Sequence, residues 1–191
     1  MAAAAAASSP PPRPTVAVFG ASWAAPDSSL YTLSVDLGAA LAAAGFDVIS
    51  GGYLGTMEGV SRGATASGGS ATGVLVPSLF PGRDARGNDF LTRRVDAPSL
   101  LARIDTILAE APRLLVALPG TLGTATEIFC AWNNAMLCQL RGATPPKIIC
   151  FREPWEVVLT CVLTGLKLGD DVAKYIVYVD SAEECVRELL K

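Results

Sequence analysis

Residues 118–127 combine side chains that can hold a phosphate with a carboxylate that can do chemistry beside it. The segment reads Leu-Pro-Gly-Thr-Leu-Gly-Thr-Ala-Thr-Glu and follows an apolar run typical of a strand. Glycine lets the backbone turn sharply and approach a ligand closely. The unpaired N–H groups at the start of a following helix attract anions. Gly120, Gly123 and Thr124 are therefore candidate phosphate ligands, and Glu127 is the candidate catalytic carboxylate.

The spacing of Thr124 and Glu127 also has a purely structural explanation. It matches a capping box, in which a threonine side chain caps a helix and a glutamate three residues later bonds back to the cap N–H. A glutamate held in this way is directed away from a ligand. The sequence alone leaves both interpretations of Glu127 open.

Two more glycine-containing segments, residues 20–22 and 51–57, follow predicted strands. Glycine at a strand-to-helix turn is commonly structural, and this explains the first segment as well as ligand binding does. All three together indicate a ligand that carries phosphate. Neither the dinucleotide pattern G-x-G-x-x-G nor the Walker pattern occurs, which disfavours classical NAD or ATP binding.

The composition excludes several kinds of chemistry. The chain has no histidine, which excludes Ser-His-Asp triads, Cys-His dyads and histidine-ligated metals. A net charge of −3 gives no electrostatic attraction to nucleic acid, and no apolar stretch reaches the roughly 18 residues of a membrane span. The five cysteines show no C-x-x-C spacing and are interpreted as buried apolar side chains in a reducing compartment. We therefore expect a cytoplasmic protein without a nucleic-acid or membrane partner.

Short β-rich runs alternate with amphipathic stretches from residue 15 onward. Residues 1–14 are low-complexity Ala, Ser and Pro and are predicted to be a disordered tail, so that residues 15–191 form one domain. Predicted strands are 15–20, 47–52, 71–77, 113–119, 147–151 and 175–180, and predicted helices are 28–44, 56–68, 99–110, 124–140, 154–165 and 181–190. The alternation predicts a Rossmann-like α/β fold with a doubly wound parallel sheet. The irregular segment 80–88 either closes over a ligand or is a solvated connector.

Residues 119–127 resemble the P-G-G-x-G-T-x-x-E signature of the "lonely guy" cytokinin-activating phosphoribohydrolases. Residues 51–57 and 18–22 are similar to two other segments of that family, and the resemblance spans roughly residues 15–185. It implies hydrolysis of the N-glycosidic bond of a purine nucleoside 5′-monophosphate, giving free base and ribose 5-phosphate, without a metal or cofactor. It also implies that Glu127 is catalytic together with Arg103, which stands 24 residues earlier. The substrate-binding residues that it implies are Ser22, Gly51, Gly52, Met57, Gly120, Thr121, Gly123 and Thr124.

One residue departs from the signature. Thr121 stands where the family has a second glycine, so the phosphate loop gains a Cβ that can narrow it. Molybdenum-cofactor carrier proteins of algae have a similar fold. A carrier that binds a nucleotide or the molybdenum cofactor without turnover is therefore the alternative to an enzyme.

The predicted helix 124–140 is apolar around most of its circumference. Its large apolar side chains include Ile128, Phe129, Trp132, Met136 and Leu137, a wider set than one sheet face needs. The extra apolar surface predicts a homodimer built around this helix. The resemblance agrees, because the family is generally dimeric.

Overall fold

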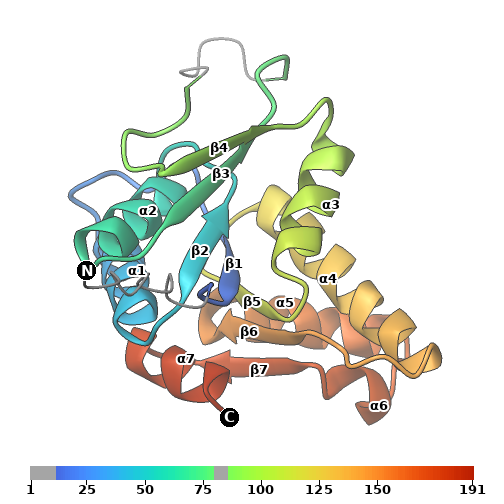
Figure 1. Ribbon diagram of the computed structural model, residues 1–191. Helices are drawn as coiled ribbons and strands as arrows, with labels where there is room; N and C mark the ends of the chain where they lie inside the picture. Colours follow the sequence, from blue (N-terminus) through green and yellow to red (C-terminus); the bar gives the residue numbers. More distant parts are fainter. Residues whose placement is uncertain (1–11, 80–85) are drawn as a thin grey trace, which may run out of the picture.

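Seven parallel strands form one sheet in the order β4-β3-β2-β1-β5-β6-β7 (Figure 1). The computed structural model describes residues 12–79 and 86–191. Within these residues the strands are β1 (Thr15–Phe19), β2 (Asp47–Ser50), β3 (Ala71–Leu75), β4 (Arg93–Asp96), β5 (Leu114–Ala117), β6 (Lys147–Phe151) and β7 (Ile176–Val179). The chain adds strands on one side of β1 as far as β4 and then crosses to β5 on the other side. The predicted Rossmann-like α/β fold is confirmed.

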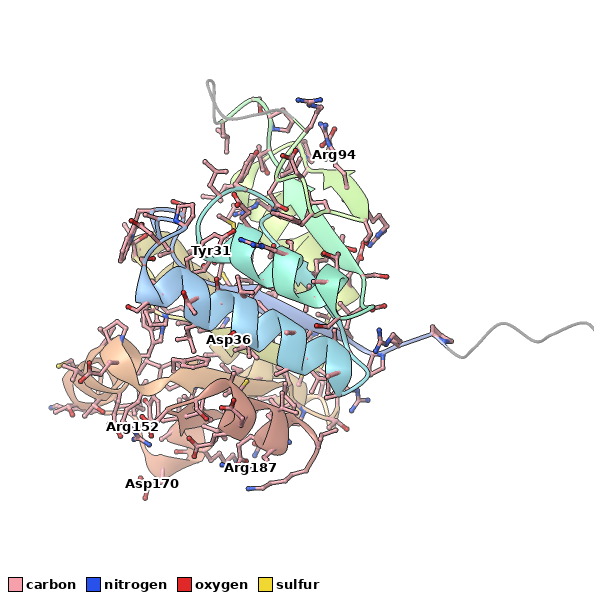
Figure 2. All side chains as sticks on the ribbon, turned by 90° about the vertical axis from the view of Figure 1, so that its left-hand side faces the viewer. Tyr31, Asp36, Arg94, Arg152, Asp170 and Arg187 are labelled. Atoms are coloured by element: carbon pink, nitrogen blue, oxygen red, sulfur yellow. The ribbon has the colours of Figure 1, made fainter. Side chains whose placement is uncertain are left out.

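Helices cover both faces of the sheet because side chains alternate along each strand. Val16 and Val18 pack in the core under α1 (Ser29–Ala43), α2 (Thr56–Ala66) and α7 (Ala182–Leu189), the face shown in Figure 2. Ala17 and Phe19 pack in the opposite core, under α3 (Leu100–Glu110), α4 (Leu122–Leu140), α5 (Arg152–Gly165) and α6 (Asp170–Ala173). Strands buried on both faces explain the continuous apolar runs in the sequence.

Serine side chains fix the starts of three helices. Ser28, Ser99 and Ser181 are the N-caps of α1, α3 and α7, and each hydroxyl accepts a hydrogen bond from a backbone N–H of the first turn. At α7 the Glu184 carboxylate also accepts from the backbone N–H of Asp180, at 2.8 Å. The predicted start of this helix at Ser181 is therefore confirmed.

The sequence prediction missed two short elements, the edge strand β4 and the single-turn helix α6. β4 reads Arg-Arg-Val-Asp and is mostly exposed, so it has no apolar run by which to recognise it. Arg93 and Arg94 are exposed, and they form ion pairs with Glu110 and Asp96. Charged side chains on an edge strand also discourage pairing with another chain.

The folded part of the chain begins slightly before the predicted boundary at residue 15. The Arg13 guanidinium donates a hydrogen bond to the Gly68 carbonyl at 2.8 Å, and the Pro14 carbonyl accepts from the Asp47 N–H at 3.0 Å. Residues 1–11, the greater part of the predicted tail, lie outside the described residues, as do residues 80–85 of the predicted irregular segment.

Two general expectations can be compared with residues 12–79 and 86–191. No helix in these ranges is long and apolar enough to cross a membrane, and no group of acidic and cysteine side chains there could hold a metal ion.

Cys150 and Cys185 are buried as predicted, and Cys130 and Cys138 are partly buried. Cys161 on α5 is exposed, so the prediction of a buried side chain is wrong for this residue.

Candidate functional site

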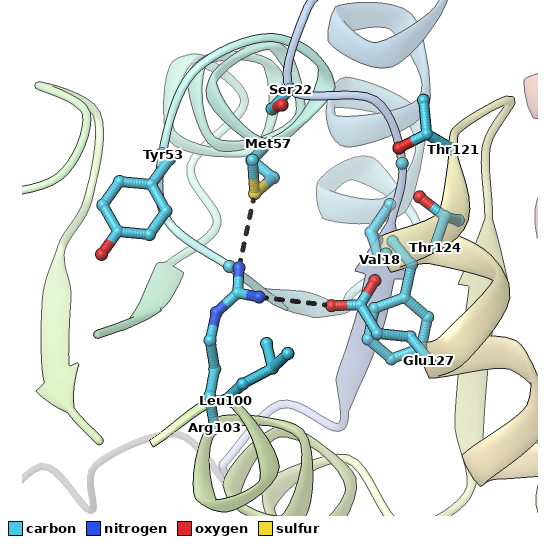
Figure 3. A pocket seen from close by; sticks show the side chains of 13 residues that line it. Val18, Ser22, Tyr53, Met57, Leu100, Arg103, Thr121, Thr124 and Glu127 are labelled. Carbon is cyan, nitrogen blue, oxygen red and sulfur yellow. Dashed lines mark hydrogen bonds and ion pairs between the residues drawn. The ribbon is translucent and has the colours of Figure 1, made fainter. Parts of the chain in front are cut away.

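A cavity of about 230 Å³ opens at the C-terminal ends of β1, β2 and β5 (Figure 3). It lies at the switch point of the sheet, where β1 borders both the strand that follows it and β5, and open α/β sheets bind ligands at this point. Eight of the ten predicted site residues line the cavity: Ser22, Gly51, Met57, Arg103, Thr121, Gly123, Thr124 and Glu127. The three glycine-containing segments therefore converge on one site.

Arg103 of α3 and Glu127 of α4 face each other across this cavity (Figure 3). Arg103 Nη1 lies 3.5 Å from Glu127 Oε1, and each residue is only 7% exposed. The two side chains come from helices on the same face of the sheet, so their meeting depends on how α3 and α4 pack. The spacing of 24 residues in the sequence thus corresponds to a direct ion pair.

The guanidinium of Arg103 is held on several sides besides Glu127. Nε donates to the Val74 carbonyl at the end of β3 at 2.8 Å, and Nη2 lies 3.7 Å from the Met57 sulfur. The Tyr53 ring faces it, with the ring centroid 5.9 Å from Cζ. A Cβ at Gly51 would overlap the guanidinium, so glycine is required there for Arg103 to lie against the backbone.

Burial raises the pKa of Glu127 to about 7, and the charge of Arg103 lowers it without cancelling the rise. Desolvation dominates because the carboxyl group has little contact with water and has one long ion pair to compensate for that loss. Both protonation states of Glu127 are therefore populated near neutral pH. A carboxyl group with this property is suited to proton transfer or to stabilising a developing positive charge.

The predicted phosphate loop leads directly into α4. Thr121 is the N-cap, with φ −119° and ψ −160°, and the first intrahelical hydrogen bond runs from the Ala125 N–H to the Thr121 carbonyl. The N–H groups of residues 122–124 come before that bond and have no acceptor within the helix, as is usual in the first turn. Gly123 has open space where a side chain would project. This end of α4 therefore has the properties of an anion site.

The structure decides against the capping-box interpretation of Glu127. The helix begins at Leu122, two residues earlier than predicted, so Thr124 lies inside the first turn and is not the N-cap. Glu127 consequently lies in the second turn, and its carboxylate faces Arg103. Thr121 has an extended backbone, is exposed and lines the cavity, and the narrowing of the loop by its Cβ stays a prediction.

Two of the residues predicted to bind the substrate, Gly52 and Gly120, lie beside the cavity and do not line it. Gly52 has φ +72°, and a Cβ there would meet the backbone of Gly73 on β3. A Cβ on Gly120 would overlap the Thr124 side chain. Both glycines permit close packing behind the site, which is a structural role that the sequence pattern did not separate from ligand binding.

Sequence reasoning missed three side chains that contribute to the site. Tyr53 and Leu100 line the cavity, and Asn88 is buried behind Tyr53. Tyr53 directly follows the glycine pair, so its position in that loop was a usable signal. Leu100 and Asn88 reach the site only through the packing of α3 and of the segment before β4.

The fold and its loops define a Rossmann-like α/β protein with a buried arginine–glutamate pair at the switch point of the sheet. Comparison with known families gives the particular family. Residues 13–153 match the model of the SLOG cluster4 family, and the chain belongs to that family. The match confirms the resemblance that the sequence motifs indicated.

Individual relatives agree with this assignment. A cytokinin riboside 5′-monophosphate phosphoribohydrolase of Mycobacterium tuberculosis is 29% identical over 180 residues, which cover 91% of this chain and 91% of the relative. An X-ray structure from a structural genomics consortium matches with a TM-score of 0.72 at 26% identity, covering 93% of this chain and 98% of that chain. The molybdenum cofactor binding protein of Rippkaea orientalis matches with a TM-score of 0.70 at 21% identity, covering 95% and 98%, and shows the shared fold alone.

Proposed function

We propose that this protein hydrolyses the N-glycosidic bond of a purine nucleoside 5′-monophosphate, releasing the free base and ribose 5-phosphate. The observation that carries the proposal is a buried carboxyl group, Glu127, with a pKa of about 7 in a cavity that also includes the start of α4. Leu122 and Glu127 are separated by about 7.5 Å along the helix axis. A substrate with its phosphate at the helix start can therefore place its sugar beside the carboxylate.

The bond change assigns a task to Glu127. As the bond between C1′ and the base breaks, the electron pair leaves with the base and positive charge develops on the ribose. An ionised carboxylate stabilises that charge, and it can take a proton from the water that attacks C1′. The base leaves with a proton, so that water is divided between the two products. Both tasks need Glu127 in its ionised form.

Arg103 serves this chemistry by keeping part of the Glu127 population ionised at neutral pH and by fixing the direction of the carboxylate. Its Nε is bound to the Val74 carbonyl, and the residue lines the cavity. A positive charge at this place can also stabilise electron density on the departing base.

The phosphate is assigned to Thr121, Gly123 and Thr124, and Ser22 on the neighbouring loop also lines the cavity. The backbone ties these loops together. The Ala21 N–H donates to the Pro119 carbonyl at 3.2 Å, and the Ala21 carbonyl accepts from the Thr56 N–H at 2.9 Å. With the loops held in this way, the N–H groups at the start of α4 can favour a dianion without reorganisation.

The name of the Mycobacterium tuberculosis relative supports a cytokinin nucleotide as the substrate, and this is the finer part of the proposal. A carrier that binds a nucleotide or the molybdenum cofactor without turnover is the second candidate, because the molybdenum cofactor binding protein of Rippkaea orientalis has the same fold. The two candidates differ in whether the bound molecule is cleaved.

Incubation with AMP and with prenylated AMP, followed by chromatography for free base, separates these functions. Release of base by the wild type and its loss in Glu127→Gln supports the hydrolase. Tight binding of either nucleotide without release, in calorimetry on the same samples, identifies a carrier. Absence of both binding and release contradicts the assignment of the cavity to a nucleotide.

A further inference from the structure

Asn88 is a buried polar side chain that connects the segment before β4 to the loop between β2 and α2, residues 51–55. It is 7% exposed. Its Nδ2 donates to the carbonyl oxygens of Gly52 at 3.2 Å and Tyr53 at 3.1 Å, and its backbone N–H donates to the Gly52 carbonyl at 2.9 Å. Its Oδ1 accepts from the Phe90 N–H at 3.1 Å. Three of these four bonds end on one short loop.

That loop supports the Arg103 guanidinium. Gly51 lies directly against it, and the Tyr53 ring faces it at 5.9 Å. The Tyr53 hydroxyl also accepts a hydrogen bond from the Val76 N–H at 2.9 Å, which fixes the ring at its outer end. The position of Arg103 relative to Glu127 therefore depends on where residues 51–53 lie.

Packing against the sheet holds the loop on one side. The backbone of Gly73 on β3 leaves no room behind Gly52, so the loop cannot move toward the sheet. On the other side, Asn88 and Gly87 lie against the Gly52 carbonyl. The two Asn88 amide bonds, together with the bond from the Asn88 backbone N–H, are thus polar restraints against movement away from the sheet.

We propose that Asn88 is a positioning residue, which holds the β2–α2 loop beneath Arg103 and thereby sets the geometry of the Arg103–Glu127 pair. Asparagine suits this place because its NH₂ group supplies two donors for two carbonyl groups while its oxygen accepts from Phe90. The catalytic consequence rests on the proposed hydrolase function. The structural consequence, an altered ion pair, does not.

The test compares Asn88→Ala with Thr92→Val. Thr92 is a matched control because its hydroxyl also ties the segment before β4 to the sheet, through the Ala71 N–H at 2.9 Å and the Ala71 carbonyl at 3.0 Å. Thr92 makes neither of the two bonds that the Asn88 amide makes to the Gly52 and Tyr53 carbonyls. Two quantities are measured in the full chain: kcat/KM for base release from AMP, and the pKa of Glu127 from the ¹³C carboxyl resonance that Glu127→Gln removes.

Asn88→Ala should let Arg103 move away from Glu127, which raises the pKa of Glu127 and lowers kcat/KM by between about ten-fold and a hundred-fold. Arg103 on α3 and Cys130 on α4, the helix that carries Glu127, are electrostatically coupled to Glu127, and Arg103 supplies the lowering charge. Thr92→Val should lower the melting temperature and leave both quantities at wild-type values.

Equal effects of Asn88→Ala and Thr92→Val on the Glu127 titration would overturn the proposal. If Asn88→Ala does not fold, Asn88→Ser replaces it, because a serine hydroxyl is too short to bind both carbonyl groups. A wild type that releases no base refutes the hydrolase function. The titration then still decides the role of Asn88.

Discussion

Glu127→Gln is the substitution that most directly tests the proposed chemistry, because it removes one charge and keeps the shape of the side chain. With a pKa of about 7, Glu127 is ionised in about a tenth of the molecules at pH 6 and in about nine tenths at pH 8. Since the ionised form is required, kcat/KM of the wild type should rise about ten-fold between these pH values. The variant should lose between about a hundred-fold and ten-thousand-fold of the activity and show no such rise.

The assay is chromatography of free base at AMP concentrations well below KM, repeated across this pH range. AMP itself loses a phosphate proton near pH 6, by analogy with other phosphate monoesters. The pH dependence of AMP binding to Glu127→Gln, measured by calorimetry, isolates that effect because the variant keeps the phosphate loop. A wild-type rate that stays flat or falls as the pH rises would refute the role of an ionised Glu127. So would a variant that keeps most of its turnover.

Three other predictions concern the phosphate, the departure from the signature and the assembly. AMP should bind far more tightly than adenosine, because the start of α4 favours a dianion, and equal affinities in calorimetry would exclude a phosphate site there. Thr121→Gly should change stability by only a few tenths of a kcal/mol and leave the substrate preference unchanged, because the Thr121 backbone is extended; a large gain of activity would show that its side chain obstructs the loop. We propose a homodimer that buries the exposed part of α4, and light scattering at micromolar concentration should then give the mass of a dimer. Leu137→Glu on this helix should lower that mass. Leu190→Glu, on the opposite face of the sheet, should leave it unchanged. A monomeric wild type would contradict this interface.

The surface available to such a dimer is narrower than the sequence suggested. Trp132 is 4% exposed within the single chain, and its indole N–H donates to the carbonyl of Val172 in α6 at 2.8 Å. The helix α6 was not predicted, so nothing in the sequence pattern indicated a cover for Trp132. Phe129, Leu137 and Leu140 remain exposed on α4 and carry the dimer prediction.

Local sequence patterns were sufficient wherever a short segment determines its own structure. The six predicted strands are present because apolar β-rich runs form buried parallel strands. The three glycine-containing segments converge because parallel strands end at the same edge of a sheet. The pairing of Arg103 with Glu127 was available only through family resemblance, since no local pattern relates residues on two helices.

The features that the sequence did not indicate depend on contacts between distant segments. β4 is a strand because it adds to the edge of β3, although its own residues are charged and exposed. Asn88 reaches Gly52 and Tyr53 across more than thirty positions of the chain. A lone asparagine in an irregular segment has no spacing or periodicity from which such a contact follows.

The interpretation of Glu127 was decided by where α4 begins, and Thr121 is the N-cap of that helix. Threonine and glycine are about equally good N-cap residues, so a threonine at the signature's second glycine is compatible with a helix that starts at Leu122. With the helix start at that position, Thr124 is one turn too late to be the cap. The carboxylate of Glu127 is then not needed for the helix end and faces Arg103 in the cavity. The residue that departs from the family signature is therefore compatible with the arrangement on which the proposed chemistry depends.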